Sequence, residues 1–455
     1  MAFQSSVLRD GEWVTETVNF QDALKASTAP KSNPKPRAGP PVCGVLTRTL
    51  IESPVVHWVL PVWIRSRSHN DVAFVGDHFV QISELRDDGQ VHEVIRKADF
   101  GSRIRNALVL GTPPEGGPDG TASSVIKTED TDILMQDASK PHETDARQPL
   151  PPQLLVLILE SCDMVFLSVQ ELPDHTPEFV TIKYENPRNL KFLGYHFTIN
   201  PSSRYIAAGS AEGAFMLYEL ETLANMSAQY QSHGYYQPVK NIKVRTADGI
   251  IHKLEFLHPR PEDDHHIILL LIIVRREAIR GSQTSRMVVY DWELSDNVKS
   301  VLKIEKAGMP LPKEHRMPLM IIPLRINTAF IAVSEHAIGI VKNAFVGHTE
   351  FDILEIHSPN QTNLHHGAAG PLWTAWARPF RLNKYFEKTD IIYLAREDGV
   401  IAHIELDSKD LLPSVTTVGT IGTAISTAFT TAYDVFSDVF IIGGESGPGG
   451  IWKVN

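Results

Sequence analysis

The sequence predicts an all-β fold, a seven-bladed β-propeller made of four-stranded antiparallel blades. Three observations predict it. A phrase of two apolar runs joined by a short polar turn recurs seven times along the 455 residues, an extended run precedes each copy, and long amphipathic helical patterns are nearly absent. Strands do not alternate with helices along the chain, which argues against a doubly wound parallel sheet.

The recurring phrase is clearest at Ile391–Leu406, IIYLAREDGVIAHIEL, where apolar residues flank Asp398-Gly399. Alternating apolar residues around Asp-Gly are the strongest short-range signal for a β-hairpin. Six further copies begin at Val72, Leu154, Tyr205, Ile267, Ala329 and Val439. In several copies the first run is almost continuously apolar and the second alternates, which predicts a strand buried on both faces beside a half-exposed strand.

Outer strands complete the repeating unit. After several hairpins comes a fourth extended run: VHEVIRKA, EFVTIKYE, NIKVRT and SVLKIEK. The unit of four strands then repeats roughly every 45–60 residues, a spacing typical of propeller blades with variable loops. The best helical candidate is a short segment, ETLANMSAQYQ, at residues 221–231. Each sheet has two hydrophobic faces, so we expect the blades to cover one another in a ring.

The seventh unit, residues 423–455, stops after about three strands, so the last blade is expected to be incomplete in this chain. Two explanations stay open. An N-terminal strand such as Glu12–Phe20 could complete the blade, or the chain is a fragment of a longer protein. The second explanation is favoured.

The composition predicts three regions. Residues 1–41 are polar and end in a segment rich in Pro, Lys and Ser, which indicates a flexible N-terminal arm. Residues 42–455 form the propeller. Within it, residues 112–150 hold five prolines and eight acidic residues against three basic ones, so they are expected to be a disordered acidic insertion.

Charge and cysteine content favour protein partners in a reducing compartment. The chain carries 43 basic and 54 acidic residues, a net charge of −11, which lowers the expectation of strong nucleic-acid binding. Its two cysteines, Cys43 and Cys162, lie far apart and fit the nucleus or cytoplasm. The longest apolar run, Ile267–Val274, is too short to span a membrane. No membrane partner, small-molecule substrate or cofactor is expected.

The order and length of the segments resemble one nuclear scaffold superfamily. The resemblance rests on TINPSSRYIAAGSAEGAFMLYEL, NIKVRTADGIIHKLEFLH…MVVYDWEL, AFIAVSEHAIGIVKN, IIYLAREDGVIAHIELD and VFIIGGESGPGGIWKVN, and it covers roughly residues 42–455. These segments are similar to the first propeller of that superfamily. Its members include the large damaged-DNA-binding protein subunit, the largest subunit of the cleavage and polyadenylation specificity factor, and the third subunit of splicing factor 3b.

The resemblance implies a partner-binding role. Full-length members have three propellers and a C-terminal helical part. In the damaged-DNA-binding member a cullin docks on the second propeller, and the first and third propellers form a cleft for substrate receptors. The resemblance therefore implies half of a receptor cleft and no cullin site. The insertion at residues 112–150 departs from the compact members and puts the neighbouring rim in doubt.

Catalytic readings of the sequence are weak, so a non-enzyme is expected. Ser446 in GGESGPGG has a predicted strand on each side, whereas a nucleophile elbow needs a strand followed by a helix. The segment PEDDHH at residues 261–266 has metal-ligand side chains, but consecutive residues of an extended chain point to opposite sides. A solvated loop is the favoured interpretation of that segment.

Aromatic and arginine side chains on loops are the natural anchors for protein partners. The segments WARPF and HGYYQP supply the candidates for interaction: Trp376, Arg378, Phe380, Tyr235 and Tyr236. The alternative is that these rings simply pack between blades. Both interpretations stay open.

One modification motif lies in the acidic insertion. Ile126-Lys127-Thr128-Glu129 fits the aliphatic-Lys-x-Glu pattern of SUMO acceptor sites, and Asp130 follows it. Lys127 is therefore a candidate modification site. A chance match to so short a pattern is the alternative.

The sequence thus predicts a non-enzymatic scaffold of a nuclear multiprotein complex, acting either in the DNA damage response as a ubiquitin ligase adaptor or in pre-mRNA processing. Its expected partners are protein subunits of that complex. The alternative is a propeller that contacts nucleic acid directly within such a complex. The local basic concentrations for that role are KVRTADGIIHK, residues 243–253, and IVRREAIR, residues 273–280.

Overall fold

The computed structural model describes residues 2–9, 12–19, 55–86, 88–113, 150–186, 190–260, 262–263, 265–276, 283–304, 306–325, 328–335, 337–344, 350–354, 371–379, 389–407, 413–421, 429–432, 438–443 and 450–454. The chain divides into two compact units, Met1–Ser53 and Pro54–Asn455. In the first unit, β1 (Ala2–Arg9) and β2 (Glu12–Asn19) form an antiparallel hairpin.

The second unit consists of seven antiparallel sheets, which confirms the predicted seven-bladed propeller. Blade 1 contains β3 (Val56–Val62), β4 (Asp71–Gly76), β5 (Val80–Leu85) and β6 (Val91–Lys97). Blade 2 contains β7 (Ile104–Leu110), β8 (Leu154–Leu159), β9 (Met164–Glu171) and β10 (Pro177–Tyr184). Blade 3 contains β11 (Leu193–Ile199), β12 (Tyr205–Ser210), β13 (Ala214–Leu220) and β14 (Val239–Thr246).

Blade 4 contains β15 (Ile250–Leu257), β16 (His266–Arg276), β17 (Gln283–Glu293) and β18 (Met309–Pro310), and blade 5 contains β19 (Met320–Pro323), β20 (Phe330–Val333), β21 (Ile338–Lys342) and β22 (Glu350–Leu354). Blade 6 contains β23 (Trp373–Ala377), β24 (Thr389–Arg396), β25 (Val400–Asp407) and β26 (Pro413–Thr420). Blade 7 contains β27 (Phe429–Ala432), β28 (Asp438–Ile442) and β29 (Gly450–Val454). Short helices follow the third strands of blades 3 and 4: α2 (Leu223–His233) and α3 (Val298–Lys303).

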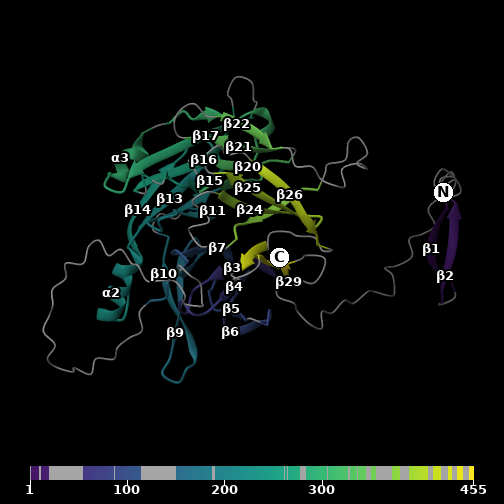
Figure 1. Cartoon of the computed structure of the whole chain (residues 1–455), viewed down its shortest axis with the longest axis horizontal. Coiled ribbons are helices and arrows are strands. Elements are labelled where there is room, and N and C mark those ends of the chain that lie inside the picture. The colour runs from purple at the N-terminus through teal and green to yellow at the C-terminus, as the bar shows by residue number, and fades with distance from the viewer. Residues whose placement is uncertain are drawn as a thin grey trace, which may run out of the picture. The chain divides into compact units, whose positions relative to one another are not determined.

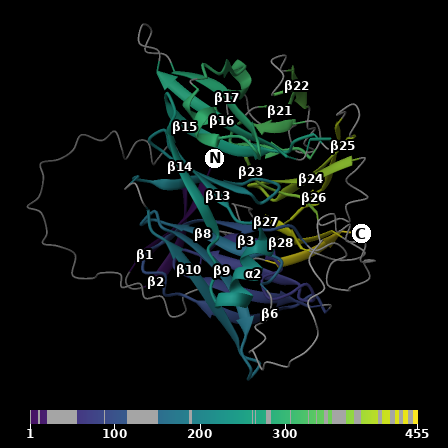
Figure 2. The same cartoon turned by 90° about the vertical axis from the view of Figure 1, so that its left-hand side faces the viewer.

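The blades close into a ring. The first strand of each blade contacts the first strand of the next, and β27 of the last blade returns to β3 of the first. Blade 7 lies beside blade 1: β29 is near β3 and β4 in Figure 1, and β28 is next to β3 in Figure 2. Seven apolar clusters hold the ring together, and each lies between two adjacent blades. The cluster that closes the ring joins Val59 and Val72 of blade 1 to Val439 and Ile441 of blade 7.

The ring explains the two kinds of strand in the sequence. All six residues of β8 are fully buried, because the side chains of each face pack against a different neighbouring blade. Burying one such Leu, Ile or Val side chain contributes roughly 1.5–3 kcal/mol. The outer strand β10 alternates between exposed and half-buried residues. The hairpin at Ile391–Leu406 is also confirmed: Gly399, at φ 88°, closes the turn by donating its backbone N–H to the carbonyl of Arg396 at 2.9 Å.

One predicted strand is wrong. The first four residues of SVLKIEK, Ser300–Lys303, lie in α3 instead of an outer strand, and the fourth strand of blade 4 is the short β18. The Asn297 side chain caps α3 by accepting from the backbone N–H of Lys299, and Val298 and Leu302 bury the same side of the helix. The buried residues Val298 and Leu302 are four positions apart, as on one side of a helix, whereas the prediction assumed the alternation of a strand. The short helix predicted at residues 221–231 is confirmed as α2.

The seventh sheet has three strands among the described residues, as the sequence suggested. The segment proposed to complete it, Glu12–Asn19, pairs with Ala2–Arg9 instead. Residues 20–54 and 114–149, which include most of the predicted arm boundary and of the acidic insertion, lie outside the described residues.

Candidate interaction surface

The propeller presents two faces, defined by the direction of its inner strands. Hydrogen bonds between neighbouring inner strands join like ends: Asn106 near the start of β7 donates to the carbonyl of Gly194 near the start of β11 at 3.3 Å. Arg378, just after β23, donates to the carbonyl of Pro323 at the end of β19 at 2.6 Å. The inner strands thus run in the same direction. We call the face where they begin the entry face and the other the exit face.

A polar pocket of about 280 Å³ opens on the exit face. It lies among the segments that follow the inner strands β11 and β15, beside Arg325 just after β19. The polar side chains that line it are hydrogen-bonding or basic, and none is acidic: Asn200, Ser202, His258, Arg260, His266 and Arg325. An anionic group is the complementary ligand for such a lining.

Two side chains that line the same pocket, His258 and Arg325, have lowered pKa values. Burial lowers the pKa of His258 well below its usual range, and the cations Arg378 and Arg325 lower it further. The imidazole is therefore neutral at pH 7. Burial and the nearby Arg378 lower the pKa of Arg325 to about 10, although Asp390 acts in the opposite direction. Clusters of shifted groups in a concave site are typical of functional sites, although structural ion pairs also produce them.

Arg378 forms an internal clamp beside this pocket. Its Nε and Nη2 donate to Asp390 at 2.9 and 3.0 Å, and the Asp390 side chain is 0% exposed. Asp390 also accepts from the backbone N–H of Arg325 at 2.8 Å. The Arg378 side chain, at 11% exposure, therefore fixes the loop after β19. This geometry fits the packing interpretation of Arg378, while its role as a partner anchor stays a prediction.

Trp376 occupies the inner strand of the same blade. Its ring is half-buried against the cluster between blades 5 and 6, and the Arg378 guanidinium lies 5.6 Å from the ring centroid. This arrangement also fits packing between blades. Phe380, the third candidate of this segment, lies outside the described residues.

Tyr235 and Tyr236 lie on the exit face, just after α2. Gly234 ends the helix at φ 79°, a left-handed conformation that suits glycine. Tyr236 is 2% exposed and packs in the cluster between blades 2 and 3, with its hydroxyl 3.5 Å from that of Ser168. Tyr235 is 61% exposed. Of the two rings, only Tyr235 is placed to meet a partner.

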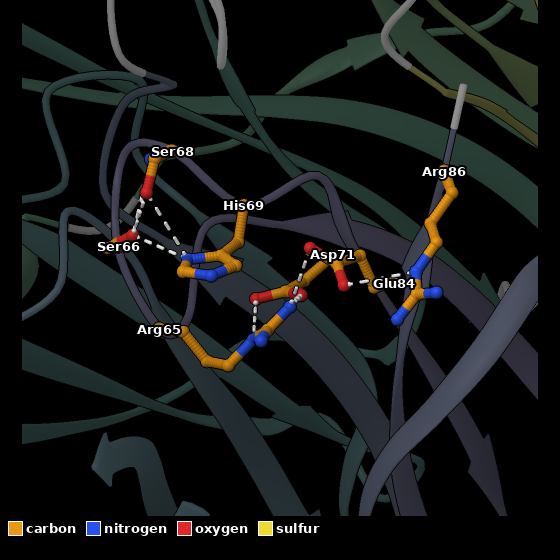
Figure 3. A network of polar contacts seen from close by, with 7 residues as sticks. All are labelled: Arg65, Ser66, Ser68, His69, Asp71, Glu84 and Arg86. Carbon is orange, nitrogen blue, oxygen red and sulfur yellow. Dashed lines mark hydrogen bonds and ion pairs between the residues drawn. The ribbon is translucent and has the colours of Figure 1, made fainter. Parts of the chain in front are cut away.

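A second clamp occupies the equivalent position in blade 1 (Figure 3). Arg65 follows the inner strand β3, and its Nε donates to both carboxylate oxygens of Asp71 at 3.0 and 3.1 Å. Asp71 is 0% exposed in its side chain, and burial raises its pKa even though Arg65 favours the charged form. Glu84 contacts the same guanidinium at 3.2 Å, and a Ser66–His69 bond of 2.7 Å braces the loop.

Further buried titratable groups line the inner strands of blades 3 and 4. The Thr198 hydroxyl of β11 donates to the Glu255 carboxylate of β15. Burial raises the pKa of Glu255 to about 7, and burial lowers the pKa of nearby Lys253. His196 bonds through Nε2 to the carbonyl of Ile251 at 2.9 Å, and burial lowers its pKa to about 4. No sequence motif indicates this group, because its members come from different blades.

The metal-ligand pattern of the sequence has no assembled counterpart in the part of the chain that the structure describes. No group of three or more His, Cys, Asp or Glu side chains there could hold a metal ion. In the PEDDHH segment, His266 lies 3.5 Å from Asp263 and 3.7 Å from Asp291. Ser446 and Lys127 lie outside the described residues, so their interpretations stay predictions. Among the described helices, none is long and apolar enough to cross a membrane.

Comparison with known proteins agrees with this architecture. No curated protein matches the chain. The sequence model of the family described as "RSE1/DDB1/CPSF1 first beta-propeller" matches residues 55–455, which is most of the chain and all seven blades. This chain belongs to the RSE1/DDB1/CPSF1 first β-propeller family.

Proposed function

We propose that this chain is a non-enzymatic scaffold that binds protein subunits of a nuclear multiprotein complex, in the DNA damage response as a ubiquitin ligase adaptor or in pre-mRNA processing. Family membership supports a scaffold module. The ring uses its apolar surface to hold blades together, so its loops are available for recognition.

One observation carries the proposal: five exposed apolar side chains lie on the entry face, a set that we call the apolar band. Single exposed apolar residues are ordinary on a soluble protein, whereas a gathering of them marks an interaction site. The members lie at or just before the starts of four inner strands and are 46–66% exposed: Val55, Phe192, Tyr195, Ile250 and Met317. This band is the natural centre of a protein interface.

Affinity purification of the full chain from nuclear extract, followed by mass spectrometry, tests the proposal. Recovery of splicing factors, polyadenylation factors or cullin components would identify the branch. A double variant, Tyr195→Ser with Ile250→Ser, should lose most of those proteins because both side chains are exposed and contribute little to the fold. Recovery of no nuclear complex by the wild-type chain would contradict the proposal.

Direct contact with nucleic acid is the second candidate. The two basic segments of the sequence converge in the structure, where Arg245 and Arg275 line one pocket. Binding through phosphates would weaken steeply with salt, with a slope set by the number of cations involved. Fluorescence anisotropy of a labelled RNA at 50 and 200 mM salt would measure this loss of affinity. The loss between these concentrations reaches about 10³-fold for proteins that contact six or more phosphates, and it is smaller for fewer contacts.

A further inference from the structure

The two basic segments meet in a pocket of about 230 Å³ at the entry face, between blades 3 and 4. Arg245 is the last residue but one of the outer strand β14, Arg275 is the last but one of β16, and Lys306 follows α3. These three cations face one lining carboxylate, that of Asp248. Asp248 pairs with Arg275 and Asp291 pairs with Lys306, so the three cations exceed their carboxylate partners by one positive charge, that of Arg245, in a chain of net charge −11.

The Arg245 guanidinium has unused hydrogen-bonding capacity. Its Nε is buried and has no hydrogen-bond partner within the described residues. A buried donor without a partner costs roughly 1–3 kcal/mol, and buried polar groups in folded proteins are nearly always paired. An anion in the pocket would balance the positive charge of this guanidinium.

Arg275 shows which anion fits. Its Nη2 lies 2.8 Å from the Asp248 carboxylate, and its Nε donates to the Asp248 carbonyl at 2.6 Å. The Asp248 side chain is 67% exposed, so its carboxylate reaches the guanidinium from the solvent side. An incoming carboxylate could take the same place. Lys306 is already engaged with Asp291 at 2.9 Å, which leaves Arg245 as the main unsatisfied cation.

One wall of the pocket, at residues 247–249, packs closely against the backbone of Gly213 in blade 3. Ala247 donates its backbone N–H to the carbonyl of Gly213 at 2.8 Å. A Cβ at Gly213, whose φ is 89°, would clash with the carbonyl oxygen of Gly249. The turn of blade 3 and the link to blade 4 are therefore locked together, and the pocket is formed before a ligand arrives.

The apolar band adjoins this pocket. Ile250 follows the Ala247–Gly249 wall directly and is 57% exposed. Tyr195 lies one residue before His196, which bonds to Ile251, so its backbone is close to Ile250; its ring lies 6.3 Å from that of Phe192 and 5.2 Å from the Arg105 guanidinium of blade 2. A basic pocket beside aliphatic and aromatic anchors fits a peptide with acidic and apolar residues. A nucleic-acid backbone would need a row of cations, whereas this pocket gathers three cations at one place.

We infer that the pocket of Arg245, Arg275 and Lys306 binds a carboxylate side chain of a partner protein, whose neighbouring apolar residues pack on Ile250 and Tyr195. This inference deepens the proposed function, since it names the chemistry of one docking site on the scaffold.

Binding to three probes tests the inference: a fluorescein-labelled peptide of alternating Glu and Leu, its Gln-Leu counterpart, and a labelled 12-nucleotide single-stranded DNA. With the full chain, the Glu-Leu peptide should bind at least tenfold more tightly than the Gln-Leu peptide. Arg245→Gln should weaken the Glu-Leu peptide roughly tenfold, since a charge-assisted hydrogen bond is lost. Asp248→Asn should strengthen it about threefold, because a competing carboxylate is removed.

Arg86→Gln is the matched control, since Arg86 is an exposed arginine on blade 1, at the exit face. It should leave the affinity unchanged, and circular dichroism should show that all variants keep the fold. Equal affinity for the two peptides, failure of the Glu-Leu peptide to bind, or no effect of Arg245→Gln would overturn the site. Arg245-dependent binding of the DNA instead would overturn the peptide assignment.

The outcome is distinguishable from that of the proposed function. Peptide binding uses the purified chain alone, whereas the scaffold role is tested by recovery of nuclear subunits. If the inference holds, Arg245→Gln removes a subset of the recovered proteins and Arg86→Gln removes none. If the chain recovers no nuclear complex but binds the peptide through Arg245, the site stands and the nuclear role fails.

Discussion

The clamps of blade 1 and blade 6 have the same geometry and different electrostatics. In each, an arginine just after the inner strand holds a fully buried aspartate at the start of the second strand: Arg65 with Asp71, and Arg378 with Asp390. The same device thus closes the same loop at two places in the ring. Each carboxylate fixes backbone that irregular structure alone would leave loose.

The surrounding charges differ. In blade 1, Glu84 joins the clamp and in turn contacts Arg86 at 3.7 Å, so two cations meet two carboxylates. In blade 6, Arg378 lies near Arg325. Asp390 accepts hydrogen bonds from the Arg378 guanidinium and from the backbone N–H of Arg325. The blade 1 network is balanced and structural, whereas the blade 6 clamp leaves positive charge beside the exit-face pocket. Repeats can therefore share a fold-stabilising contact while only one of them lies beside a pocket lined by basic side chains.

Asp390→Asn is the most damaging substitution expected. It would leave two guanidinium groups close together with no carboxylate between them, and the free energy of unfolding should fall by about 3–5 kcal/mol. Urea denaturation monitored by tryptophan fluorescence would measure the loss. Glu178→Gln, at an exposed carboxylate on β10, is the control and should change stability by less than about 0.5 kcal/mol.

Asp71→Asn should cost less, about 2 kcal/mol, because Glu84 stays in contact with Arg65. The same urea titration compares the two variants. A loss as large as that of Asp390→Asn would show that Glu84 does not compensate, and the contrast between the two clamps would fail.

Glu255→Gln should change how stability depends on pH. The pKa of Glu255 is raised to about 7 in the folded state, above its ordinary value of 4.5. The folded state therefore holds its proton more tightly, and stability is lost as pH rises from about 4.5 through 7. Since the side chain is half-buried, the loss should be on the order of 2 kcal/mol. Thermal melts at pH 4.5, 6 and 8 should show this decline reduced in the variant.

Tyr235→Ser should have the smallest effect on stability. Its ring is 61% exposed, so the free energy of unfolding should change by less than about 0.5 kcal/mol. If Tyr235 anchors a partner, co-purification of that partner should fall at least tenfold while the melting curve stays the same. A large loss of stability would show instead that the ring supports the helix before it.

Much of the fold could be predicted from the sequence, because a blade is defined by local signals. The continuous apolar run at Leu154–Leu159 and the turn at Asp398-Gly399 follow directly from burial and backbone conformation. SVLKIEK misled the prediction because Leu302 and Ile304 alternate as in a strand, whereas the helical partner of Leu302 is Val298, which precedes the segment.

The sequence by itself determined the repeat, the number of blades and the segments that carry basic or aromatic residues. The tertiary structure alone decided which of these residues meet. It placed Arg378 on a buried aspartate, left Tyr235 exposed while burying Tyr236, and brought Arg245 to Arg275 across two blades. The reason is physical: hydrogen-bonding period and apolar spacing act within a strand, whereas contacts between blades depend on how closed sheets pack around the ring.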